Sequence, residues 1–221
     1  QRSSIAYDSE SGRIYFTTKG GYLYSAEVDP QSGALSDLKC TELKMQSTST
    51  PVVYQGRVYF GMGNGFGTGY LTVADAETME LLFRVKMKGY PQGSVLLTTA
   101  YETEGYLYLY MTYNNHPGGI SLIKVKKDCS KQADAQLIEL YDAAGYEEYC
   151  ITSLICDSEG TIYYKNDSGC IFAIAVPTYQ NVIDLINDIG TVSKESEGKV
   201  IAARAAYNAL DQANQAKVSN Y

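Results

Sequence analysis

The sequence has no Trp and only one His, His116, among its 221 residues. A Ser-His-Asp triad needs a histidine beside a nucleophile, and a His-rich metal site needs several histidines that converge. His116 lies in a Pro-Gly-Gly loop. Both kinds of site are therefore excluded within this chain.

Charged residues are also scarce, at 19%, and the net charge is −7. Nucleic-acid binding needs clustered Lys and Arg to neutralise phosphates, and here the basic residues are scattered. No stretch approaches the roughly 18 to 20 apolar residues of a membrane span. The start, Gln1-Arg2-Ser3-Ser4, leads straight into a strand without a signal peptide. We expect neither a nucleic-acid partner nor a membrane span, and this start does not show a cytoplasmic protein.

The five cysteines, an odd number, include no Cys-x-x-Cys pair, so neither a zinc site nor a dithiol redox motif is indicated. We expect free, mostly buried thiols that behave as small hydrophobic side chains. The alternative is a disulfide among Cys150, Cys156 and Cys170.

Tyrosine is abundant, with 21 Tyr against 5 Phe. Tyr suits half-buried pleated surfaces, because its ring packs while its hydroxyl reaches water or a partner. The composition therefore favours β-sheets with wet faces and edges.

A repeat runs through the first three quarters of the chain. Each copy has a strand, a turn that contains Gly, and a Tyr-rich strand, at residues 4–16, 51–60, 96–110 and 153–164. A second glycine opens a third strand in each copy, and hairpin turns often demand the positive φ that glycine tolerates. The glycine pairs are Gly12 and Gly21, Gly56 and Gly69, Gly105 and Gly119, and Gly160 and Gly169.

Four antiparallel strands repeated every 40 to 55 residues are the signature of a β-propeller blade. We predict an all-β fold with blades over about 3–46, 47–91, 92–145 and 146–177, within a domain of residues 1–177. A β-sandwich with similar hairpins is the alternative. The fourth copy lacks an outer strand, so we expect an arc of a larger propeller whose open edges allow self-association.

After Pro177 the apolar period becomes helical. Val182, Ile183, Leu185, Ile186 and Ile189 predict a helix that stops at Gly190, with further helices over 200–210 and 212–218. Ser196 is a candidate cap for the second helix. Residues 178–221 thus form a small helical segment.

The blades resemble quinoprotein-like (PQQ-like) repeats, on the strand, Gly and Tyr pattern and on Asp75-Ala76-Glu77-Thr78-Met79-Glu80-Leu81-Leu82-Phe83. That run is similar to the family's Asp-Ala-x-Thr-Gly-x-x-x-Trp turn, with Met79 in place of Gly and Phe83 in place of Trp. The resemblance covers about 175 residues and is specific for fold rather than activity. Enzymes of the family that use the quinone need a Trp platform, which this chain lacks, and we expect no cofactor and no bound metal.

Segments 49–54, 112–119 and 163–169 look like propellers of modular surface proteins from gut Gram-positive bacteria, and the helical tail is similar to a helical repeat of such proteins. The resemblance implies an extracellular, cell-surface protein.

One face of the blades gathers the polar side chains that suit a carbohydrate or protein ligand. It is the face that carries the loops between second and third strands and the links between blades. Lys19, Thr48, Gln92 and Glu148 belong to it, and the candidate ligand-binding residues are Asn64, Phe66, Tyr90, Asn114, Asn115, His116, Tyr149, Lys165, Asn166 and Asp167. The alternative is an ordinary set of polar loops.

The sequence therefore indicates a noncatalytic binding or scaffold module. The alternative is a catalytic propeller, lyase- or hydrolase-like, whose site is completed by further blades. The Asp residues beside turn glycines are explained better as turn formers than as paired acid and base.

Overall fold

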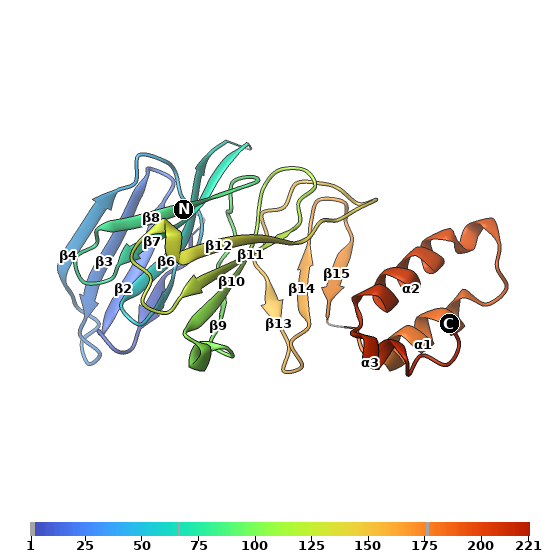
Figure 1. Ribbon diagram of the computed structural model, residues 1–221. Helices are drawn as coiled ribbons and strands as arrows, with labels where there is room; N and C mark the ends of the chain where they lie inside the picture. Colours follow the sequence, from blue (N-terminus) through green and yellow to red (C-terminus); the bar gives the residue numbers. More distant parts are fainter. Residues whose placement is uncertain (1–2, 66, 176) are drawn as a thin grey trace. The chain divides into compact units, whose positions relative to one another are not determined.

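A computed structural model describes residues 3–65, 67–175 and 177–221 of the chain (Figure 1). Its strands form four sheets that follow one another in the order of the sequence. The first sheet holds β1 (Ala6–Asp8), β2 (Arg13–Thr18), β3 (Tyr22–Val28) and β4 (Leu35–Glu42). The second holds β5 (Val52–Tyr54), β6 (Arg57–Asn64), β7 (Thr68–Asp75) and β8 (Leu81–Met87). The third holds β9 (Leu96–Thr98), β10 (Tyr106–Thr112), β11 (Ile120–Lys126) and β12 (Ala135–Tyr141). The fourth holds β13 (Ile155–Cys156), β14 (Ile162–Lys165) and β15 (Ile171–Ile174).

Each sheet is a meander in which neighbours in sequence are neighbours in space. In the first sheet, for example, Tyr15 pairs with Ala6 on one side and with Ser25 on the other. The predicted β-propeller blades are confirmed, and among the described residues the fourth sheet has three strands.

The first glycine of every pair adopts positive φ, as predicted: Gly12 (70°), Gly56 (70°), Gly105 (82°) and Gly160 (89°). The second glycine of each pair is required for one of two different reasons. Gly21 and Gly169 also have positive φ, at 84° and 83°. At Gly69 and Gly119 a Cβ would instead collide with the carbonyl oxygens of Gly89 and Tyr141. Positive φ alone is therefore the wrong explanation for half of these second glycines.

The third blade has a short inner strand. The inner strand of the third blade ends at Thr98, because Glu102–Glu104 form the 3-10 helix η1, in which the Gly105 N–H donates to the Glu102 carbonyl. The glycine-rich segment 61–69 lies mostly within strands, because β6 continues through Gly61 and Gly63 to Asn64 and β7 begins at Thr68. These two glycines let Pro91 and Tyr90 lie directly against the strand.

The turn at residues 75–83 accommodates both residues that differ from the motif it resembles, Met79 and Phe83. Met79 adopts the left-handed conformation, with φ of 63°, and its side chain is buried. Asp75 stabilises this turn by accepting from the Glu77 and Thr78 N–H groups. Phe83 is buried in the core between the second and third blades. A buried Met and a buried Phe thus occupy the positions of the family's Gly and Trp.

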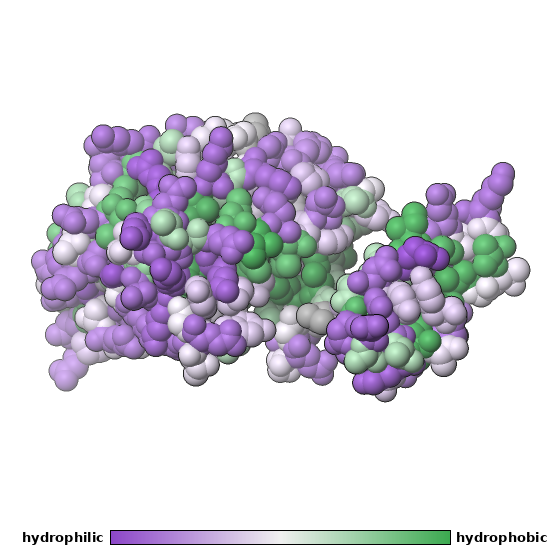
Figure 2. Space-filling view, viewed as in Figure 1, coloured by the Kyte–Doolittle hydropathy of each residue, from purple (hydrophilic) through white to green (hydrophobic). Residues whose placement is uncertain are grey.

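The core lies between blades. One cluster joins the first two blades through Tyr15, Leu23, Phe60 and Met62, and another joins the second and third through residues such as Leu109. Alternate residues of β2 are buried, which is the period of two expected of a strand with one face covered. In Figure 2 the viewed face of the blades is mostly hydrophilic. The apolar side chains of these clusters are therefore buried where neighbouring sheets stack.

Hydroxyl groups tie strands of the first and third blades to the links that follow them, and tie the first link to the second. Thr17 Oγ1 donates to the Ser49 carbonyl (2.7 Å), Ser49 Oγ to the Gly93 carbonyl (2.7 Å), and Thr112 Oγ1 to the Thr152 carbonyl (2.6 Å). These bonds place Ser49, Gly93 and Thr152 at equivalent points of the three links.

The chain divides into two compact units: residues 1–156 with 163–172, and residues 157–162 with 173–221. The domain limits expected from the sequence, 1–177 and 178–221, stay predictions. The second unit contains α1 (Tyr179–Ile189), the 3-10 helix η3 (Lys194–Ser196), α2 (Glu197–Ala209) and α3 (Gln212–Gln215). Val182, Leu210 and Val218 form its core.

The helical predictions are confirmed in outline and corrected in detail. Gly190 ends α1, with φ of 60°. Ser196 precedes α2, but its side chain makes no cap bond and its hydroxyl accepts from the Ser193 N–H instead. The third helix was expected to reach residue 218, but it ends at Gln215. The N–H groups of Lys217 and Val218 donate three residues back, which tightens the chain beyond the helix.

All five cysteines are free thiols, so the alternative disulfide is not formed. Only Cys129 and Cys150 are buried, whereas Cys40 and Cys156 are exposed, and the expectation of mostly buried thiols is wrong. In the part of the chain that the structure describes, none of the helices has the length and apolar character of a membrane span.

Candidate functional site

The antiparallel meander gives the blade unit two functional faces. The turns between first and second strands and between third and fourth strands lie on one, which we call the turn face. The loops between second and third strands and the links between blades lie on the other, which we call the loop face. On each face the described residues of the first blades line a cavity, and these two cavities differ in chemistry.

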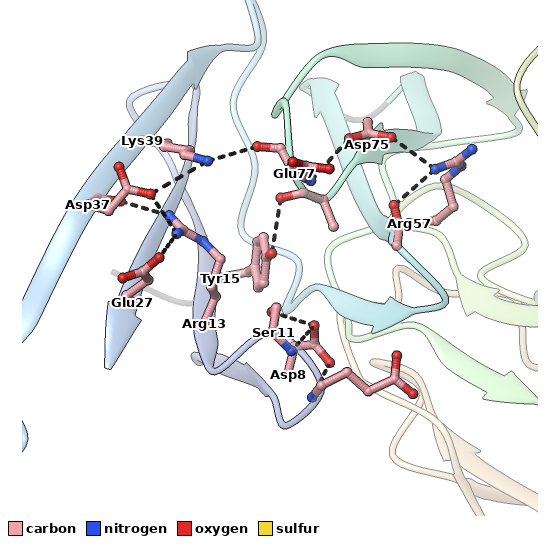
Figure 3. Close-up of a pocket in the computed structure, with 13 residues that line it drawn as sticks. Asp8, Ser11, Arg13, Tyr15, Glu27, Asp37, Lys39, Arg57, Asp75 and Glu77 are labelled. Atoms are coloured by element: carbon pink, nitrogen blue, oxygen red, sulfur yellow. Dashed lines mark hydrogen bonds and ion pairs between the residues drawn. The ribbon is translucent and has the colours of Figure 1, made fainter. Parts of the chain in front are cut away.

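The turn-face cavity has a volume of about 570 Å³. Figure 3 shows its charged side chains arranged around Tyr15, which donates from its hydroxyl to the Ala76 carbonyl at 3.0 Å. It is lined by Asp8, Glu10, Ser11, Arg13, Tyr15, Glu27, Asp37, Lys39, Gly56, Arg57, Asp75, Ala76 and Glu77.

Every cation of this cavity is already engaged. The buried Arg13 donates to Ser25 Oγ (2.8 Å), Glu27 Oε1 (3.2 Å) and both the side chain and the carbonyl of Asp37 (2.8 and 2.7 Å). Lys39 Nζ donates to the Glu77 carbonyl at 3.0 Å.

Arg57 completes this set on the second blade. It donates to the Asp75 carboxylate at 3.0 Å and to the Cys129 carbonyl at 3.0 Å. The cavity is therefore walled by a network that ties blades together.

Two carboxylates of the network, Asp37 and Asp75, have lowered pKa values. The hydrogen bond from Arg13 is the main reason why the pKa of Asp37 lies below its ordinary value. Burial raises the pKa of Asp75, but hydrogen bonds from Thr78 and Glu77 outweigh it and leave the pKa lowered. Both carboxylates thus act as fixed acceptors rather than as proton donors near neutral pH.

The loop-face pocket is smaller, with a volume of about 230 Å³. Three links and three loops contribute to it. Its lining residues are Lys19, Gln46, Thr48, Gly65, Tyr90, Gln92, Asn114 and Ile151.

Tyr90 and Asn114 form its most buried wall, at 2% and 5% exposed. The Asn114 N–H donates to the Tyr90 carbonyl at 2.8 Å, which fixes the position of Asn114 through its main chain. Gly63 makes room for the Tyr90 ring, because a Cβ there would lie 3.0 Å from two ring atoms.

The Asn114 side chain is the exceptional group of this pocket. Its Oδ1 atom is buried and accepts no hydrogen bond from any described residue. Elsewhere in the lining the hydroxyls of Thr48 and Tyr90 are 3.4 Å apart, and Thr48 Oγ1 donates to Gln92 Oε1 at 3.4 Å. The pocket therefore offers a buried acceptor beside long, weak hydrogen bonds.

Of the ten residues expected on this face, the structure brings Tyr90 and Asn114 into the pocket. Three others take part in local contacts: Asn115 Nδ2 donates to the Lys88 carbonyl (3.0 Å), and the His116 ring meets the Tyr149 ring edge-on at 4.6 Å. Asn64 and Lys165 are exposed and do not line it.

The remaining three candidate residues are Asn166, Asp167 and Phe66. Asn166 Nδ2 donates to the Tyr146 carbonyl at 2.7 Å, and the Asp167 N–H donates to the Tyr149 carbonyl at 3.0 Å. Phe66 lies outside the described residues.

Sequence reasoning missed Gln46, Gly65 and Ile151. Ile151 had a signal: it precedes Thr152, just as Thr48 precedes Ser49 and Gln92 precedes Gly93. Thr48, Gln92 and Ile151 thus occupy one repeat position. Alignment of the three links would have placed Ile151 in the pocket.

The lining of this pocket does not fit a pyrroloquinoline quinone. That group is a flat tricarboxylate, whereas the pocket has one cation, Lys19, and a volume below the about 300 to 1,000 Å³ typical of ligand sites. Within the described ranges no group of three or more His, Cys, Asp or Glu side chains could hold a metal ion.

Comparison with solved structures shows the propeller fold. The quinohemoprotein alcohol dehydrogenase from Comamonas testosteroni aligns with a TM-score of 0.50 and 16% identity, over 77% of this chain and 33% of its own. A second, ADHIIG from Pseudomonas putida HK5, has a TM-score of 0.49, 15% identity and coverage of 74% and 31%. BamB from Moraxella catarrhalis has 0.41, 12%, 77% and 56%.

The chain spans about one third of the length of the two dehydrogenases. At these identities the likeness concerns the fold alone. No known protein family matches the sequence, and no curated protein matches it.

Proposed function

We propose that this chain is a noncatalytic binding module of an extracellular, cell-surface bacterial protein, and that its ligand inserts one small polar group into the loop-face pocket. The observation that carries the proposal is Asn114 Oδ1, a buried acceptor without a donor among the described residues. Leaving such a group unsatisfied costs about 1 to 3 kcal/mol. A ligand that donates to it would recover that energy.

The position of Asn114 supports this reading. Its main chain, through the bond to Tyr90, already fixes the loop, so no structural role is visible for its amide. An apolar side chain of similar size would avoid the unsatisfied carbonyl. The amide is therefore better explained by a ligand than by the fold.

The cell-surface location rests on the resemblance of segments 49–54, 112–119 and 163–169 to modular surface propellers. Further blades are part of the same proposal. Ile155 and Ile171 are 66% and 79% exposed, and they border a cavity of about 250 Å³ on the fourth blade. Tyr7 of β1 is 58% exposed. Inside this chain, neighbouring blades cover such side chains, and the open blade edges would otherwise allow self-association.

The test is a calorimetric titration of the protein with a panel of methyl glycosides and short peptides. At least one should bind, and Asn114→Ala should weaken it about tenfold or more, since the recovered hydrogen bond is lost. Asn64→Ala, which removes an exposed amide of the same face outside the pocket, should bind as the wild type does.

The same variants separate binding from folding. Asn114→Ala should unfold at the same denaturant concentration as the wild type or a higher one, because it removes an unsatisfied acceptor. A panel without saturable binding, or binding that Asn114→Ala leaves unchanged, would overturn the proposal. Mass spectrometry should recover the ligand intact, whereas a cleaved ligand would support the catalytic alternative.

A further inference from the structure

The loop-face pocket also carries information about which ligand it takes, given that it is a ligand site as proposed above. We infer that it binds an acidic monosaccharide unit, a single sugar ring that bears one carboxylate beside its hydroxyls. Four properties of the lining lead to this class: size, charge, the set of donors and acceptors, and apolar contact.

Size limits the ligand to one ring. A volume of about 230 Å³ corresponds to roughly seven or eight water molecules at ~30 Å³ each. It lies below the about 300 Å³ at which sites for drug-sized ligands begin. A small hydroxy acid would leave much of this space empty, and a disaccharide would extend beyond it.

Charge favours an anion. Lys19 is the only charged residue among the described residues that line the pocket. In contrast, Lys39, Lys88 and Lys127 each have a carboxylate partner. Lys19 forms no ion pair with any residue that the structure describes. It stays unpaired even though acidic residues outnumber basic ones and the net charge is −7. One ammonium group matches one carboxylate.

The donors and acceptors call for hydroxyls next to that carboxylate. Gln92 Oε1 is engaged by Thr48, so its amide NH₂ is the part that can donate, and no described residue accepts from it. Lys19 and Gln92 together can donate to a carboxylate, while Asn114 Oδ1 needs a donor such as a sugar hydroxyl.

Apolar contact is available for the ring itself. Ile151 is 46% exposed at the pocket, and the ring of Tyr90 lies in its wall. The C–H face of a pyranose can pack on such side chains while its hydroxyls bond to the amides. A peptide C-terminus would match Lys19 and could donate to Asn114 from its last N–H, but it has no saturated ring to pack on Ile151 and Tyr90.

The experiment compares two ligand pairs that differ only at one carbon: methyl galacturonide against methyl galactoside, and methyl glucuronide against methyl glucoside. At low salt the wild type should bind an acidic member about fivefold or more tighter than its neutral partner, as one charge-assisted hydrogen bond would give. Lys19→Gln should bring the two affinities together. Lys86→Gln, a matched exposed lysine outside the pocket, should leave the preference unchanged.

The outcomes distinguish this inference from the function on which it rests. Equal binding of acidic and neutral sugars that still depends on Asn114 would overturn the inference and leave the binding module intact. Tighter binding of acetyl-Gly-Ser than of either uronide would replace the sugar by a peptide terminus and also overturn it. If no tested ligand binds in a way that Asn114→Ala weakens, the proposed function itself is overturned.

Discussion

The turn-face cavity and the loop-face pocket are built by the same blades, yet they differ in how their polar groups are used. The larger cavity, of about 570 Å³, joins cations and carboxylates from two blades, and its cations already have partners. The smaller pocket, of about 230 Å³, contains the buried side-chain carbonyl of Asn114, which has no partner among the described residues. A large charged cavity can thus be a structural joint, whereas a buried acceptor without a partner that also lines a pocket is the better candidate for a ligand site.

Gly69→Ala should break the loop-face pocket most strongly. A Cβ at residue 69 would lie 2.5 Å from the Tyr90 Cα and closer still to the Gly89 carbonyl, so the link that carries Tyr90 must move. We expect a loss of about 3 kcal/mol in the free energy of unfolding, as for overpacking, together with loss of ligand binding.

The control is Gly67→Ala in the same loop, where a Cβ would meet nothing within 4 Å. Chemical denaturation and calorimetry measure both effects. Equal stability of the two variants would show that the close approach at Gly69 does not shape the pocket.

Arg13→Leu should break the turn-face network and spare the ligand site. Leu retains some of the side-chain packing but removes four hydrogen bonds, among them those to Ser25 and Asp37, so we expect a loss of about 2 to 3 kcal/mol. Arg84→Leu is the matched control, since Arg84 has no hydrogen bond or ion pair in the described part of the chain. Ligand affinity should be unchanged in folded Arg13→Leu, and a large drop in it would make the turn-face cavity part of the site.

The smallest expected effect is on pH dependence. The pKa of Asp37 is lowered from 3.8, mainly by the Arg13 hydrogen bond. A carboxyl with a depressed folded pKa stabilises the protein above its unfolded pKa, and this contribution is lost as the pH falls through the folded pKa. Denaturation measured from about pH 5 down to about pH 2 should show a shallower loss of stability in Arg13→Leu than in the wild type. Asn114→Ala should follow the wild-type curve, and identical slopes in all three proteins would contradict the role of Arg13.

The sequence predicted the blades because their signals are local. A turn glycine with positive φ, such as Gly56, and the alternation of buried residues along β2 follow from short-range geometry. The turn of Met79 was also visible as a motif, although its substitution for glycine gave no hint that a buried side chain can hold φ at 63°.

The site was less predictable because it depends on contacts between segments far apart in the chain. Sequence placed Tyr90 and Asn114 on one face, but only the structure shows that Asn115 and Asn166 use their amides on nearby carbonyls while Asn114 does not. Three asparagines of one face look alike in the sequence. Their different hydrogen bonds separate them.

The main-chain bond from Asn114 to Tyr90 has a consequence for how such modules diverge. A residue whose loop is fixed by its backbone can change its side chain without disturbing the scaffold. Repeat positions 48, 92 and 151 surround it, while glycines 61, 63 and 69 are constrained by close packing. Natural variants of this propeller should therefore exchange the first set freely as their ligands change, and retain the second.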